Sequence, residues 1–144
     1  MDQIYNRKKH QQLLDSKRLE GKSAIELSNY RVMVYCQLIW GTRNEFLEIF
    51  KDFLENKITR GDFCELIDTK LTLAQDFANE NVLENDIFDK VSEDFTSLVD
   101  DVIISCDICD PTPEPYRLPH HIGETEFRQE IQELFLMLQK LVEE

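Results

Sequence analysis

Hydrophobic positions along this chain recur every three or four residues in four separate stretches. That spacing places apolar side chains on one face of an α-helix. The last stretch is the most regular, with Phe127, Ile131, Leu134 and Leu138 along a single stripe. The four stretches that the pattern predicts as helices are 42–56, 59–77, 86–110 and 125–142.

Polar residues at the expected starts of these helices support the assignment. Thr42 with Glu45, and Thr59 with Asp62, have the spacing of a capping box, in which side chain and backbone satisfy each other's donors. Asn85 is the expected N-cap of the third helix. Gly123 or Thr125 is expected to cap the fourth, after a proline-rich stretch that cannot continue a helix.

The segment 23–40 (SAIELSNYRVMVYCQLIW) is the most ambiguous part of the pattern. Its apolar run from Val32 to Trp40 fits a buried helix of about four turns, and its β-branched and aromatic residues also permit a strand. We predict a helix, because no second strand is apparent for it to pair with, and Gly41 then ends it.

Residues 1–24 are polar and mostly basic, with few apolar positions, and are predicted to be a frayed helix or a solvated arm. The rest, 25–144, is expected to be one domain. Four glycines and four prolines in 144 residues favour long helices over a turn-rich β architecture. Short connections between helices are typical of bundles, so the prediction is an all-α antiparallel four-helix bundle with an additional N-terminal helical segment.

The predicted helix 86–110 has two contrasting faces. One is an apolar stripe about 100° wide, as expected of a core-facing helix, and consists of Phe88, Val91, Phe95, Leu98, Val99, Val102 and Cys106. Carboxylates recur every seven residues on the other side, at Asp86, Glu93, Asp100 and Asp107. Residues seven apart on a helix are about 10.5 Å apart, wider than consecutive phosphates, so they do not mimic a nucleic-acid strand one for one.

Acidic charge is concentrated after residue 43. Residues 1–43 carry eight Lys/Arg and four acids, whereas residues 44–144 carry eight Lys/Arg and 25 acids. The acidic part therefore disfavours direct binding to nucleic-acid phosphates. It favours a basic protein partner, whose approach it would steer. The alternative is that the acids only keep the protein soluble.

The four cysteines follow a polar start without the apolar region of a signal peptide. We therefore expect reduced thiols and a cytoplasmic location, or an equivalent reducing compartment such as an organelle stroma. No apolar run is long enough to cross a membrane, so no membrane association is predicted.

No pattern in the chain predicts catalysis or a cofactor. Cys106 and Cys109 form a CxxC, and His120 and His121 follow, but this spacing does not match a zinc finger. The chain has no glycine-rich phosphate loop and no nucleophile–base motif. We therefore expect neither an enzyme nor a metal site.

Three segments share the pattern of a known family. FLEIFKDFLENKITRGDF at 46–63 has an apolar helix end, a polar turn, Ile-Thr, an acid and Phe. Glu93-Asp94-Phe95 supplies an acidic pair before an apolar residue, and EFRQEIQELFLMLQKL at 126–141 supplies a last amphipathic helix. In these features residues 43–142 resemble the colicin D-type immunity proteins.

The resemblance implies a small antiparallel four-helix bundle that inhibits a tRNA-cleaving ribonuclease toxin. Members plug the toxin's basic active site with acids that stand in for RNA phosphates. The corresponding acids here are Asp100, Asp107 and Asp110, and Asp101 lies beside them.

The carboxylates where the helix meets the following loop are the best placed for such mimicry. The predicted partner-binding set is therefore Asp100, Asp101, Asp107, Asp110 and Glu114. The alternative is an acidic helical adaptor or regulatory protein that has no toxin partner and binds through an apolar surface at 32–40.

Overall fold

The computed structural model describes residues 4–112 and 117–143, and within these ranges the protein is all-α, as predicted. The described residues contain no β-strand; Cys109 and Ile122 form an isolated parallel bridge that joins the two sides of the last loop. The six helices are α1 (Arg7–Asp15), α2 (Lys22–Gly41), α3 (Arg43–Leu54), α4 (Arg60–Glu80), α5 (Val91–Ile108) and α6 (Glu124–Glu143).

The two predicted capping boxes have different outcomes in the structure. The capping box at the start of α4 is formed: Asp62 N donates to Thr59 Oγ1 over 3.1 Å, and Thr59 N donates to Asp62 Oδ2 over 3.3 Å. The predicted box at Thr42 is wrong. Its hydroxyl donates to the carbonyls of Leu38 and Ile39, so it satisfies the end of α2 instead of capping α3.

The start of α5 also lies later than predicted. Asn85 does not cap it; its side chain accepts a hydrogen bond from Ile87 N over 3.0 Å and forms a local turn. The chain from Asn81 to Lys90 is a connection whose Asp89 N donates to Gln37 Oε1 over 3.1 Å. Helix α5 therefore begins at Val91, where the connection meets α2.

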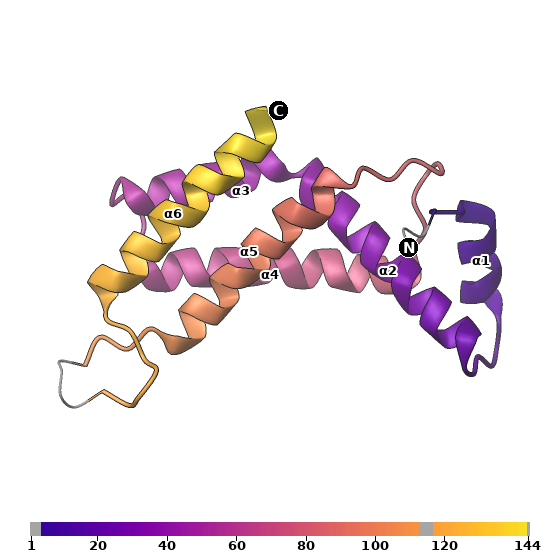
Figure 1. Cartoon of the computed structure of the whole chain (residues 1–144), viewed down its shortest axis with the longest axis horizontal. Coiled ribbons are helices and arrows are strands. Elements are labelled where there is room, and N and C mark those ends of the chain that lie inside the picture. The colour runs from indigo at the N-terminus through magenta and orange to yellow at the C-terminus, as the bar shows by residue number, and fades with distance from the viewer. Residues whose placement is uncertain (1–3, 113–116, 144) are drawn as a thin grey trace.

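Four helices enclose the main core. Helices α3, α4, α5 and α6 contact one another in a closed sequence, and α2 packs across both α4 and α5. Figure 1 shows α5 crossing the long helix α4 and α6 crossing α3, with α1 at the far end beside α2. Fully buried aromatic rings fill the centre: Phe46, Phe50, Phe53, Phe63, Phe95 and Phe127.

A second, smaller core lies between α1, α2 and the 81–90 connection. Tyr5, His10 and Leu13 are buried there against Leu27 and Tyr30 of α2. The interpretation of residues 1–24 as a frayed or solvated arm is thus wrong for Tyr5 to Leu13. Tyr5 and Leu13, the apolar side chains of this range, are both buried in this second core.

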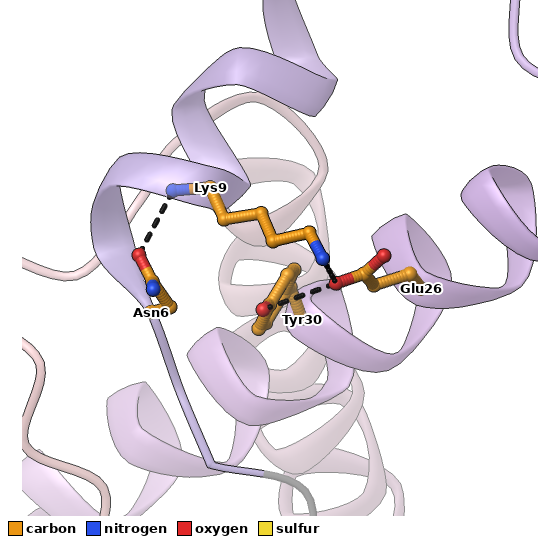
Figure 2. Close-up of polar contacts among 4 residues, drawn as sticks. All are labelled: Asn6, Lys9, Glu26 and Tyr30. Carbon is orange, nitrogen blue, oxygen red and sulfur yellow. Dashed lines mark hydrogen bonds and ion pairs between the residues drawn. The ribbon is translucent and has the colours of Figure 1, made fainter.

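Polar contacts hold α1 against α2, as Figure 2 shows. The Asn6 side chain caps α1 by accepting from Lys9 N over 3.0 Å. The ammonium of Lys9 lies 2.9 Å from Glu26 Oε1, which also accepts from the Tyr30 hydroxyl over 3.3 Å. The Asn6 cap and the Lys9–Glu26 ion pair therefore both stabilise the short helix α1.

Buried His10 makes the docking of α1 sensitive to pH. The Tyr5 hydroxyl accepts from Leu83 N over 2.8 Å, so its own hydrogen is available for His10 Nδ1, 3.0 Å away. Nδ1 can accept that hydrogen only in the neutral imidazole. Burial, aided by the positive charge of Arg31, lowers the pKa of His10 below its ordinary value.

We expect acid to weaken the docking of α1. Because the folded pKa of His10 lies below its unfolded value of about 6.5, its contribution to stability is fully present above that pH. That contribution is lost as the pH falls from about 6.5 through the folded pKa. The measurement is the urea midpoint at neutral and mildly acidic pH for the native chain and His10→Phe. An equal acid shift in both proteins would contradict the assignment.

Candidate partner-binding face

The outward face of α5 is a concentration of acids. The helix has 18 residues, no Lys or Arg, and five carboxylates that are all exposed: Glu93, Asp94, Asp100, Asp101 and Asp107. Because α5 itself has no lysine or arginine, no cation of the same helix offsets their mutual repulsion.

Phe95, Val99 and Val102 bury the opposite face of α5 and fix its rotation. All three are fully buried, and Leu98 and Cys106 of the predicted stripe are partly buried against the same core. Ser105 also faces inward, and its hydroxyl donates to Glu130 Oε2 of α6 over 2.8 Å. The apolar stripe thus directs the carboxylates outward.

Asp100 faces α2, where the Tyr35 hydroxyl donates to its Oδ1 over 3.0 Å. Desolvation against α2 raises the pKa of the Asp100 carboxyl group, the Tyr35 hydrogen bond partly offsets this, and the charge of Asp101 adds to the rise. Burial and the same contact raise the pKa of Tyr35 above its ordinary range. Asp100 is therefore held in one position at the rim of α2.

Asp107 lies in the last turn of α5, where the helix dipole disfavours negative charge. We expect Asp107→Asn to stabilise the free protein by about 0.3–1 kcal/mol. Denaturant titration of the two proteins at low salt measures the change. Asp94→Asn is the matched control, because Asp94 lies in the first turn, where the helix dipole favours negative charge. Removing that charge should therefore lower the free energy of unfolding. Stabilisation by both substitutions would indicate general repulsion, with no role for the dipole.

The four predicted site residues that the structure describes do not form one patch. Successive residues on a helix point about 100° apart, so Asp101 points about 100° away from Asp100, whereas Asp100 and Asp107 share a side. Asp110 lies beyond the helix, where its Oδ1 accepts from Thr112 N over 2.9 Å. Glu114 lies outside the described residues. The structure thus brings together Asp100 and Asp107, with Glu93 about two turns before Asp100 on the same side.

Asp110 holds the start of the last loop in place. Its backbone N donates to Ile122 O over 2.8 Å, and its carboxylate lies 3.7 Å from His121 Nδ1. Hydrogen bonds from Thr112, aided by His121, lower the pKa of Asp110. Because its oxygens are engaged in the turn, Asp110 is better explained as a structural residue than as a partner contact.

A disulfide joins α4 to α5 directly beneath this face. Cys64 is bonded to Cys106, with their Cα atoms 6.0 Å apart, while Cys36 and Cys109 are free. The prediction that all four thiols are reduced is therefore wrong for this pair. The CxxC does not act as a unit, because its first cysteine pairs across helices and its second ends α5.

Periodicity alone did not identify the neighbours of Asp100 from other helices. A small hollow beside it is lined by Val32, Tyr35 and Cys36 of α2, Gln75 of α4, and Thr96 and Asp100 of α5. The only sequence signal for Thr96 was its position four residues before Asp100, which places the two on the same side of the helix. The residues of α2 and α4 are distant from Asp100 in the sequence, and only the packing of the helices brings them next to it.

No family model, curated protein or solved structure was found to match this chain. Within the described residues, no group of histidine, cysteine and acidic side chains is arranged to hold a metal ion. None of the described helices combines the length and apolar character needed to cross a bilayer.

Proposed function

We propose that this chain is a non-enzymatic binding protein that recognises a basic protein surface through the acidic face of α5. The observation that carries the proposal is the row of five exposed carboxylates on α5, a helix that has no lysine or arginine of its own. A basic partner would supply the missing charges and relieve their repulsion, which favours both fast association and selectivity.

The resemblance of residues 43–142 to colicin D-type immunity proteins supports a more specific proposal. In it, the partner is a tRNA-cleaving ribonuclease toxin, and the acids of α5 occupy the basic site that otherwise holds RNA phosphates. The closed contact sequence of α3, α4, α5 and α6 is compatible with the four-helix bundle of that family. Helices α1 and α2 are additions, and α2 borders the proposed binding face.

The test is direct binding and protection. The full chain is mixed with tRNA-cleaving toxin domains, and complex formation is measured by calorimetry at low and high salt. Cleavage of a tRNA substrate is measured in parallel. We expect a complex that weakens with salt and blocks cleavage by at least one toxin. Absence of both, with every domain tested, would contradict the toxin proposal.

The alternative is an acidic helical adaptor that binds through an apolar surface. The segment 32–40 does not supply that surface, because most of it is built into the cores and Val32 alone is strongly exposed. Helix α4 instead exposes Leu66, Leu73 and Phe77 along one side. Replacing these three with glutamine should abolish adaptor binding, whereas toxin inhibition should persist.

A further inference from the structure

The hollow beside Asp100 contains a buried hydroxyl that has no hydrogen-bond partner among the described residues. Thr96 is 4% exposed, and its Oγ1 makes no hydrogen bond of normal geometry to any of them. Its polar neighbour is the thiol of Cys36, which is a weak donor and acceptor. Buried hydroxyls are nearly always satisfied, so Thr96 indicates a place where a polar group from outside is expected.

Two further acceptors border the same hollow. Tyr35 occupies Oδ1 of Asp100, which leaves Oδ2 available. Gln75 donates its side-chain amide to Asn79 Oδ1 over 3.0 Å, which leaves its carbonyl oxygen available. Thr96, Asp100 and Gln75 all line one space of about 160 Å³.

We propose that this hollow is a socket for a lysine side chain of the protein partner. An ammonium has three donors and no acceptor, which matches the oxygens of Asp100, Thr96 and Gln75. Thr96 and Asp100 lie four residues apart on one side of α5, about 5–6 Å between Cβ atoms. The Thr96 oxygen is covered in the free protein, so the entering ammonium contacts it only once the side chains at the rim move aside. Exposed Val32 at the rim would cover the aliphatic stem of the lysine.

An arginine fits the socket less well. A guanidinium binds a carboxylate best through two parallel hydrogen bonds, and this requires both carboxylate oxygens. The Tyr35 hydroxyl already occupies one of them. The socket therefore deepens the proposed function, on which it rests, by predicting that a lysine of the basic partner enters between α2, α4 and α5.

The experiment uses n-butylammonium chloride as the probe and the full chain at physiological salt. Two-dimensional NMR spectra are followed during the titration, with the methyl groups of Val32 and Thr96 as reporters. We expect saturable shifts at these methyls, at least tenfold weaker binding in Asp100→Asn, and several-fold weaker binding in Thr96→Val. Both variants keep the size of the side chain, and circular dichroism checks their helices.

The matched control is Asp76→Asn, which removes the same charge from an exposed position of α4 outside the acidic face of α5. It should leave the affinity within about twofold of the native value. Equal losses in Asp100→Asn and Asp76→Asn would overturn the socket, as would equal shifts with neutral 1-butanol or tighter binding of n-propylguanidinium. Because no toxin is present, these outcomes are independent of whether a toxin complex forms.

Discussion

Removing the Cys64–Cys106 disulfide is expected to lower the free energy of unfolding by about 4 kcal/mol. The two cysteines are 42 residues apart, and a cross-link that closes such a loop reduces the entropy of the unfolded chain by about this amount. The bond joins the second turn of α4 to the last turn of α5, so it closes the whole 81–90 connection into the loop.

The measurement is urea denaturation of the native chain, before and after reduction, and of the Cys64→Ala/Cys106→Ala variant. With a typical urea dependence of about 2 kcal/mol per molar, the midpoint should fall by about 2 M. Cys109→Ala is the control, since Cys109 is a free and partly exposed thiol. Its midpoint should match that of the native chain when oxidised and fall by the same amount on reduction.

Thiol counting separates the two ways in which this expectation can fail. Alkylation of the unfolded, unreduced chain should modify two cysteines, and alkylation after reduction should modify four. Four modified thiols before reduction would mean that the bond is absent. Two before and four after, with an unchanged urea midpoint, would mean that the bond forms without contributing to stability.

Sequence periodicity predicted the helices well because most of them bury one regular stripe. The stripe of α5 is an example: Phe95, Val99 and Val102 were assigned to the core from spacing alone and are fully buried. Thr59 capped α4 as predicted, because a capping box is local and involves residues three apart. Thr42 failed because α2 ends beside it and offers competing carbonyls.

Long-range contacts were not predictable from the pattern. Tyr5 receives a hydrogen bond from Leu83, 78 residues away, and this contact helps convert the supposed arm into a packed helix. Cysteine spacing did not indicate which thiols pair, because the pairing depends on how α4 and α5 cross. The hollow beside Asp100 likewise combines residues of three helices. Periodicity shows which face of a helix is buried, but it does not identify the helices and side chains that pack against that face.

Neutralising three acids of α5 is expected to weaken binding to a basic partner by about 3 kcal/mol, roughly 100-fold. The variant is Asp100→Asn/Asp101→Asn/Asp107→Asn. Each amide keeps the shape of its carboxylate, and the amide oxygen introduced at position 100 can still accept from the Tyr35 hydroxyl, so the fold is retained. Asp110 is left unchanged because it holds the turn at Thr112.

The control removes three exposed acids from elsewhere, by Glu48→Gln/Glu65→Gln/Asp76→Asn on α3 and α4. Both triple variants have the same net charge, so they experience the same loss of long-range attraction. Affinity for the toxin domain is measured across a range of salt concentrations. A difference in affinity between the two variants then reflects where the removed carboxylates lie on the protein. We expect the α5 variant to lose affinity mainly through faster dissociation, and the control to lose only a modest part of its association rate.

The free proteins should respond in the opposite direction. Repulsion among the α5 carboxylates is relieved in the triple asparagine variant, and Asp107 no longer opposes the helix dipole, so its unfolding midpoint should rise. Lost binding together with raised stability is the signature of residues that serve recognition at the expense of the fold. Equal loss of affinity in the two triple variants would instead attribute binding to net charge. Loss of stability in the α5 variant would make these acids structural, and the binding face would then have to lie elsewhere.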